Sequence, residues 1–283
     1  MGTVRDRMIQ DLAFAGYAER TQRVYLSAAE ELVAFHRRSP SELTQDQVRT
    51  WVDHLLQRGL SAQRIGQHFA ALRLLFGKTM GRPEVVAFLT RPRANERLPI
   101  VLSIEEVGRL LDAIATPKFH AFFTLLYATG LRISEAVQME TRDIDAARGV
   151  IHVRHGKGKS KERFVPLSAR LLAKLRDYWK SERPAAPWLF ASAAGRPLHG
   201  DVLRMALALA AEQAQLTKRV TPHLLRHSFA THMLEGGTDL RVLQVLLGHA
   251  KIETTARYVR VSTAMIAKAG SPLDLLPQND EAT

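Results

Sequence analysis

The chain contains no cysteine among its 283 residues. Disulfide bonds, thiolate metal sites and cysteine nucleophiles are therefore excluded. Long apolar runs are also missing, because no uninterrupted stretch approaches the length of a membrane span. The first six residues lack the apolar core of a signal peptide. We expect a cytoplasmic protein, associated with the nucleoid and without a membrane partner.

Acidic residues are scarce relative to basic ones. Asp and Glu together number 28 against 40 for Lys and Arg, which gives a formal net charge of +12 and a pI near 10.3. This excess favours a polyanionic partner, since each phosphate that is neutralised releases counterions. A basic protein without such a partner would show the same charge. The length and an apolar fraction of 46% fit two folded domains.

Residues 1–90 are predicted to form a compact helical domain. Helices are expected at 6–13 and 21–36, and a capping box at Thr44–Gln47 begins a third helix. Ser61 can cap a fourth. The predicted apolar faces of the second and fourth helices contain Val24, Ala28, Leu32, Phe35, Ile65, Phe69, Leu72 and Phe76.

Basic residues on this domain and after it are candidates for contact with DNA. Arg64 and Arg73 lie on the polar face of the fourth helix, which is either solvated or in contact with phosphates. Residues 91–99 have no periodicity and contain two prolines, so we expect a basic linker that includes Arg91 and Arg93. An ordinary solvated hinge would have the same composition.

Residues 100–272 are predicted to form a second domain, mainly helical with a small β-sheet, followed by a loose tail at 273–283. Another capping box, Ser103–Glu106, opens it. Short strands are expected at 150–154 and 162–167. Helices are expected at 119–128, 169–179, 201–213, 223–234 and 240–247, and in a last short segment that bears Tyr258.

His223 and Arg226 are three residues apart and therefore lie on one face of a helix. They fall near its N-terminus, where free backbone N–H groups favour an anion, so this pair is a candidate phosphate site. A metal site would instead use His223 and His227, with His232 nearby. The His-Glu-x-x-His pattern is missing, and Arg226 would place a positive charge beside the metal, so we predict no metal.

Further cations come from two loops. Arg132 follows Gly130 at the junction of two predicted helices, where its guanidinium can bind phosphate oxygens in a bidentate manner. The loop between the two strands carries Lys157, Lys159 and Lys161. It is not a nucleotide-binding P-loop, because the residue at position 153 is valine rather than glycine. This loop is expected to reach a DNA groove, and any of its lysines can donate a proton to a leaving oxygen.

Tyr258 follows a Gly-His turn at Gly248–His249. A tyrosine hydroxyl is a poor nucleophile at neutral pH, because its ordinary pKa is about 10. It becomes useful when other groups take its proton and stabilise charge on its target. The cations described above fit phosphoryl transfer without a metal ion, a nucleotide or another cofactor.

These motifs resemble those of the tyrosine recombinases of the phage integrase type. The resemblance covers nearly the whole chain, more loosely in the N-terminal domain, and favours a simple Xer-like or transposon-encoded enzyme. It implies an N-terminal SAM-like core-binding bundle that clamps DNA and an α+β catalytic domain. The segments that carry it are 128–135, 156–158, 162–167, 223–232 and 247–258.

The resemblance also implies a role for each matching residue. Tyr258 attacks the scissile phosphate and forms a 3′-phosphotyrosyl bond, while Arg132 and Arg226 hold the non-bridging oxygens. His249 hydrogen-bonds the phosphate. His223 is the acid/base partner of the tyrosine, Lys157 is the expected general acid, and Glu135 supports the arginine.

Recombination in this family runs through a Holliday junction, without ATP. The expected partner is double-stranded DNA, bound by a homo-tetramer on paired sites or by a hetero-tetramer with a related recombinase. The segment 263–269 is the candidate for docking onto a neighbouring subunit. Two alternatives remain, a type IB topoisomerase and a DNA-binding protein that has lost catalysis.

Overall fold

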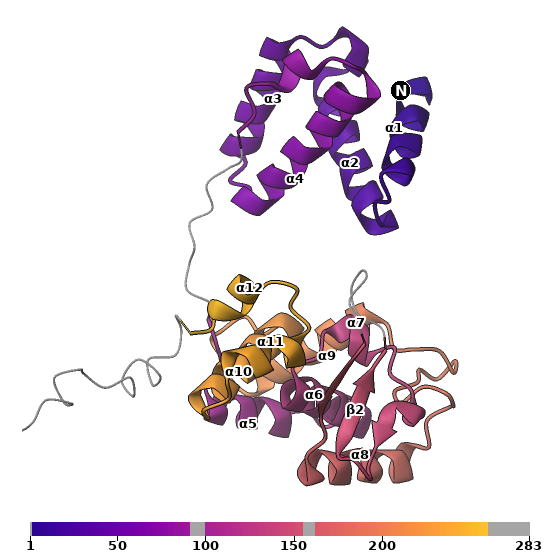
Figure 1. Cartoon of the computed structure of the whole chain (residues 1–283), viewed down its shortest axis with the longest axis vertical. Helices are drawn as coiled ribbons and strands as arrows, with labels where there is room; N and C mark the ends of the chain where they lie inside the picture. Colours follow the sequence, from indigo (N-terminus) through magenta and orange to yellow (C-terminus); the bar gives the residue numbers. More distant parts are fainter. Residues whose placement is uncertain (1, 91–99, 155–161, 260–283) are drawn as a thin grey trace, which may run out of the picture. The chain divides into compact units, whose positions relative to one another are not determined.

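The structure is a computed structural model that describes residues 2–90, 100–154 and 162–259 (Figure 1). The chain divides into two compact units, Met1–Arg97 and Leu98–Thr283. The fold is mainly helical with one small three-stranded sheet. No helix of the described part is both long and apolar enough to cross a bilayer.

The first unit is built from helices α1 (Gly2–Phe14), α2 (Glu19–His36), α3 (Gln45–Gln57) and α4 (Ala62–Leu72). Short turns η1 (Pro40–Glu42) and η3 (Pro83–Val86) complete it, and α4 continues as a π-helical segment, η2 (Arg73–Thr79). The capping box at Thr44 and the cap at Ser61 are both formed as predicted. These local hydrogen bonds satisfy N–H groups that the first helical turn leaves unpaired.

The core of the first unit gathers around Trp51 and Phe76, each at most 1% exposed. The predicted apolar face of α4 is buried along its length. The prediction for α2 was wrong at two positions, since Val24 and Phe35 are 37% and 40% exposed. Of the four predicted positions only Ala28 and Leu32 turn fully inward, because α2 packs on its neighbours along a narrower stripe than the sequence pattern implied.

In the second unit, the elements of the first half are α5 (Ile104–Asp112), α6 (Pro117–Thr129), α7 (Ile133–Ala136), η4 (Thr141–Asp143), β1 (Ile144–Asp145), β2 (Val150–Val153) and β3 (Arg163–Pro166). The second half is helical: α8 (Ala169–Glu182), α9 (Gly200–Gln213), α10 (Pro222–Glu235), α11 (Leu240–Leu247) and α12 (Ile252–Ala256). The strands pair antiparallel in the order β1-β2-β3, and Ile151 lies opposite Val165. Strand β1, two residues long, was not predicted.

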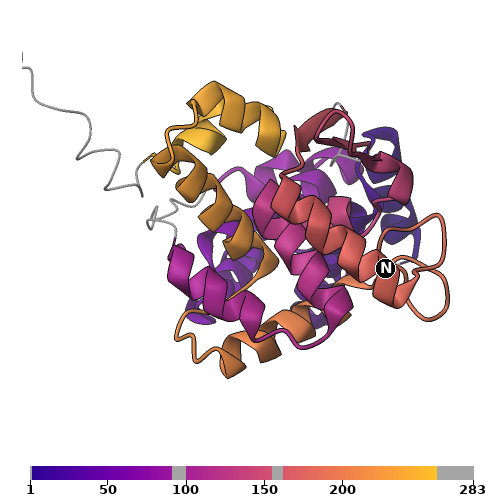
Figure 2. The same ribbon diagram turned by 90° about the horizontal axis from the view of Figure 1, so that it is seen from below.

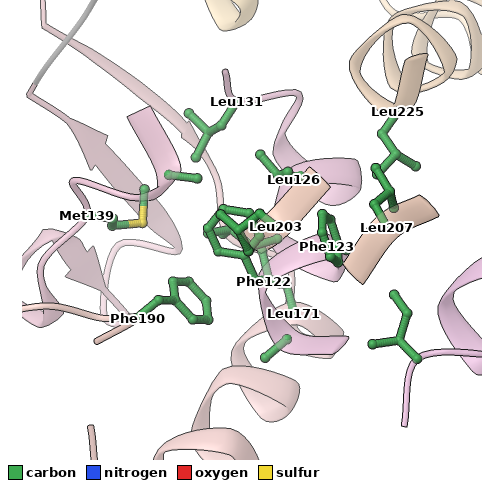
Figure 3. Packing of buried hydrophobic residues seen from close by; sticks show 14 of the residues in the cluster. Phe122, Phe123, Leu126, Leu131, Met139, Leu171, Phe190, Leu203, Leu207 and Leu225 are labelled. Atoms are coloured by element: carbon green, nitrogen blue, oxygen red, sulfur yellow. The ribbon is translucent and has the colours of Figure 1, made fainter. Parts of the chain in front are cut away.

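Helix α6 lies at the centre of the second unit, in contact with α5, α7, α8 and α10 (Figure 2). No residue from Lys118 to Thr129 is exposed, as the continuous apolar sequence predicted. Phe122, Phe123 and Leu126 pack there against side chains from the surrounding helices (Figure 3). This buried helix ends at Thr129 and is capped by Gly130, so the surrounding helices hold its C-terminus in place beside the site.

Candidate active site

Arg226 is buried, at 2% exposure. It lies on α10, which Thr221 caps by accepting a hydrogen bond from the Leu224 backbone N–H at 3.1 Å. Its guanidinium donates to the carbonyl oxygens of Gly130 and Leu247, both at 2.6 Å. Burial, with the repulsion of Arg132, lowers the pKa of Arg226 to about 10, so the side chain remains charged at neutral pH.

Arg132 stands at the start of α7 and points toward the same region. Its Nη1 atom lies 2.8 Å from Glu135 Oε1, and its Nη2 atom donates to the Gly248 carbonyl at 3.3 Å. The Arg132 backbone N–H also donates to Glu135, at 2.9 Å. The predicted support of Arg132 by Glu135 is therefore present in the structure as direct hydrogen bonds.

Arg163 is a site residue for which the sequence analysis predicted no role. It projects from β3, is 6% exposed, and binds both carboxylate oxygens of Glu135 at 3.1 and 2.7 Å. Its Nε atom donates to the Leu246 carbonyl at 2.8 Å. Glu135 thus joins Arg132 to Arg163, and although burial raises the carboxyl pKa, hydrogen bonds and charge from Arg163 leave it lowered overall. The apolar alternation of β3 was visible in the sequence, but the inward-facing arginine gave no signal of its own.

Two glycines end helices beside these arginines, at positions where a side chain would have little room. Gly130 and Gly248 end α6 and α11 in the left-handed conformation, each with φ of 62°. A Cβ atom at Gly130 would lie 2.3 Å from the ring of Phe229, and one at Gly248 would lie 3.1 Å from Arg163. Both positions require glycine for backbone conformation and for space.

His249 follows Gly248 and contacts Arg226. Its Nε2 atom lies 3.1 Å from Arg226 Nη2, and its Nδ1 atom lies 2.9 Å from the hydroxyl of Thr255. Because a guanidinium only donates, Nε2 is the acceptor and Nδ1 carries the hydrogen. Burial and then the charge of Arg226 lower the pKa of His249 to about 4, so this imidazole is neutral at physiological pH.

Tyr258 is 3% exposed, and its hydroxyl lies 2.9 Å from Nδ1 of His227. It occupies the turn that follows α12 and is not part of a helix, which corrects the prediction for that segment. Burial raises the pKa of the Tyr258 phenol, and the nearby charges of Arg226 and Arg132 offset part of that rise. The nucleophile candidate, two arginines and two histidines therefore meet in one place.

Other predicted residues lie elsewhere or outside the described residues. His223 is exposed on α10, and its ring centre is 5.4 Å from that of His227. Arg64 and Arg73 belong to the first unit, where Arg64 is 3.7 Å from Glu31 and Arg73 donates to the Leu89 carbonyl at 2.5 Å. Outside the described residues lie Arg91, Arg93, Lys157, Lys159, Lys161 and the segments 263–269 and 273–283.

The chemistry that this arrangement allows follows from its charges. Three guanidinium groups are fixed by carbonyl oxygens and only two of them pair with the carboxylate of Glu135, so the cluster retains positive charge for an anion. Preorganised cations of this kind stabilise the charge that develops on a transferring phosphoryl group. A buried hydroxyl beside them is suitably placed to attack that group.

Comparison with known proteins agrees with this geometry. Residues 101–265 match the Phage integrase family, and residues 4–85 match its N-terminal SAM-like domain. The chain belongs to the phage integrase family. It is therefore a tyrosine recombinase that carries out site-specific DNA recombination.

Its relatives include a putative integrase/recombinase of Sinorhizobium fredii, 41% identical over 98% of this chain and 91% of the relative. The tyrosine recombinase XerD of Staphylococcus saprophyticus is 34% identical over 78% of this chain and 79% of its own length. Among solved structures, the XerA recombinase is 25% identical, with a TM-score of 0.56 over 94% of this chain and 96% of its own. A Tn1549 transposon integrase in complex with transposon right end DNA shares the fold, with a TM-score of 0.75 at 18% identity over 95% of this chain and 99% of its own.

Proposed function

We propose that this recombinase cleaves and rejoins DNA strands through a 3′-phosphotyrosyl intermediate in which Tyr258 is the nucleophile. The observation that carries the proposal is the position of the Tyr258 hydroxyl, buried within hydrogen-bond distance of His227 and close to the Arg226 guanidinium. A phosphate held by Arg226 and Arg132 would lie beside this oxygen. Attack by the tyrosine conserves the phosphodiester energy in the new ester, so religation requires no ATP.

The remaining roles extend the same proposal. Arg132 and Arg226 bind the non-bridging oxygens, and His249 donates a hydrogen bond to the phosphate once DNA displaces one of its present partners. Lys157 donates a proton to the leaving 5′ oxygen. His223 is the acid/base partner that the family resemblance assigns to Tyr258.

Double-stranded DNA is the proposed partner, and a groove of the first unit supports this choice. Helices α2 and α4 line the groove, and three arginines there face one carboxylate: Arg20, Arg23 and Arg64 against Glu31. This charge suits phosphates, and the planar head of an arginine binds them in a bidentate manner. Solved structures with the same fold include the Tn1549 transposon integrase in complex with transposon right end DNA and a lambda integrase dimer bound to a core site.

We further propose that residues 1–90 clamp the DNA and that residues 91–99 connect this domain to the catalytic domain at 100–272. Two DNA sites are recombined within a tetramer, through a Holliday junction. Arg91, Arg93, Lys159 and Lys161 are proposed DNA contacts, together with Arg64. Arg73 is a weaker candidate, because its guanidinium already donates to the Leu89 carbonyl.

Trapping of a covalent adduct tests the proposal. The protein is incubated in EDTA with supercoiled DNA from its genomic neighbourhood, and the reaction is stopped with SDS. We expect DNA to be linked to the peptide that contains Tyr258, and Tyr258→Phe to bind DNA without forming an adduct. An adduct in the Tyr258→Phe protein would show that the nucleophile is a different residue.

A second experiment tests the general acid. A substrate with sulfur in place of the leaving 5′ oxygen needs no proton on departure, so it should restore cleavage by Lys157→Ala. If the sulfur substrate instead restores cleavage by Lys159→Ala and does not restore cleavage by Lys157→Ala, the general acid is Lys159.

A further inference from the structure

We propose that His227 is the general base that takes the proton of Tyr258 during strand cleavage and returns it during religation. This inference rests on the proposed function, since it assumes that Tyr258 is the nucleophile. The sequence motifs placed His223 in the acid/base role. The structure instead brings Nδ1 of His227 to 2.9 Å from the tyrosine hydroxyl.

The direction of this hydrogen bond depends on the tautomer of His227. Burial lowers the pKa of His227 to about 4, so the ring is neutral at physiological pH and one of its nitrogens can accept a hydrogen. In the tautomer whose Nε2 carries the ring hydrogen, Nδ1 accepts the hydrogen of the Tyr258 hydroxyl. This is the geometry that a general base requires before the reaction begins.

The step balances as follows. A bond forms between the Tyr258 oxygen and phosphorus while the phenol proton passes to Nδ1 of His227. The bond from phosphorus to the 5′ oxygen breaks, and that oxygen departs as a hydroxyl with a proton from the general acid. In religation the 5′ hydroxyl attacks phosphorus and gives its proton back to the general acid. The bond from phosphorus to the Tyr258 oxygen breaks, and the imidazolium of His227 returns its proton to the departing phenol.

The charges around His227 make its basicity depend on bound DNA. Burial, followed by the charges of His223, Arg226 and Arg257, lowers the pKa of His227 to about 4. The groups that face it from other elements are Tyr258 and His249, beside Arg257. A phosphate bound at Arg226 adds a negative charge, which offsets this repulsion and raises the proton affinity of the imidazole. The base is thereby strengthened when substrate is in place.

The matched control lies on the same helix. His232 Nδ1 lies 2.8 Å from the Tyr127 hydroxyl, so α10 carries a second histidine–tyrosine hydrogen bond. This second pair plays no part in the proposed reaction. His227→Asn and His232→Asn therefore remove equivalent imidazoles, and asparagine keeps an oxygen that can accept the tyrosine hydrogen without taking its proton.

Single-turnover cleavage of a substrate with sulfur at the leaving position isolates the attack step. We expect His227→Asn to reduce cleavage by about 10²- to 10⁴-fold, the usual contribution of a general base. Its rate should rise with pH, because hydroxide must replace the lost base, whereas His232→Asn should behave like wild type. Sulfur should rescue Lys157→Ala but leave the His227→Asn defect in place.

Several outcomes decide the question. Near-normal or faster cleavage by His227→Asn, while Tyr258→Phe is inactive, would overturn the role of His227 and leave the proposed function intact. An adduct in Tyr258→Phe would overturn the proposed function itself. If His227→Asn does not fold or bind DNA, His227→Gln replaces it in the same assay. The expected loss, with a rate that rises with pH, supports the role of His227, and near-normal cleavage refutes it.

Discussion

Substitution of Gly130 by alanine tests how closely α6, α10 and α11 are packed around the site. The new Cβ would lie 2.3 and 2.5 Å from two ring carbons of Phe229 and 3.1 Å from a methyl carbon of Leu247. Contacts as short as those to the ring cannot form unless the neighbouring side chains move. The backbone at Gly130 is also left-handed, with φ of 62°.

The expected cost has two parts. A left-handed alanine costs about 1–2 kcal/mol, of which about 0.4–1 kcal/mol is recovered because alanine restricts the unfolded chain. Forcing an extra carbon into a packed interior adds about 1–3 kcal/mol. Gly149 provides the matched control in the same unit, since its φ is 66° and a Cβ added there would have the Leu167 carbonyl oxygen, at 3.8 Å, as its nearest neighbour. Gly149→Ala should show the first part alone.

The quantity to measure is the free energy of unfolding of the second unit. Hydrogen exchange of peptides from this unit, in increasing denaturant, reports it. Gly130→Ala should be less stable than Gly149→Ala by about 1–3 kcal/mol, the steric part alone. Cleavage should fall as well, because the Gly130 carbonyl accepts a hydrogen bond from Arg226. Equal stability of the two variants would refute the packing described for this turn.

Three further predictions concern buried polar groups. Glu135→Gln should destabilise the second unit by about 3–5 kcal/mol in denaturant unfolding, because it leaves Arg163 buried without its carboxylate. It should also slow adduct formation, because Arg132 loses the carboxylate that holds it. The pKa of Glu135 is lowered in the folded state, so its contribution to stability is present above its ordinary pKa and is lost as the pH falls through the folded value. Wild type should therefore lose more stability than Glu135→Gln when unfolding is measured in increasingly acidic buffer, and parallel losses would contradict this. Ser228→Ala should lower the free energy of unfolding by about 1–3 kcal/mol, because the buried backbone N–H of Leu102 loses the hydroxyl acceptor that now lies at 2.9 Å. Thermal or denaturant unfolding measures this loss, and an unchanged midpoint would show that the N–H finds another partner.

The parts of the fold that the sequence predicted are those controlled by neighbouring residues. The capping boxes at Thr44 and Ser103 and the cap at Ser61 each form within four residues of the chain, and all three are present. The buried helix α6 was evident because nearly every position in it is apolar or small. Such signals depend on hydrogen bonds and periodicity within one element, so they survive without knowledge of the partner elements.

The parts that could not be predicted depend on contacts between distant segments. The exposure of Val24 depends on how far neighbouring elements cover α2. Arg163 is 28 residues from Glu135 in sequence, and its partnership is decided by the pairing of β3 with β2 and by the position of α11. His227 could be seen as a helix residue, but its proximity to Tyr258 is created by the turn after α12. Local pattern carries no information on such distances.

The charges of the site also explain how several arginines can be buried together while an anion is still attracted. Glu135 is shared between Arg132 and Arg163, so one carboxylate serves two cations. Arg226 is held by carbonyl oxygens at the ends of α6 and α11, where the helix dipoles are negative. Carbonyl groups satisfy the N–H donors and supply only partial charge, so they stabilise the guanidinium without neutralising it. A second carboxylate at either helix end would stabilise the buried arginines better, but it would compete with the phosphate that we propose they bind.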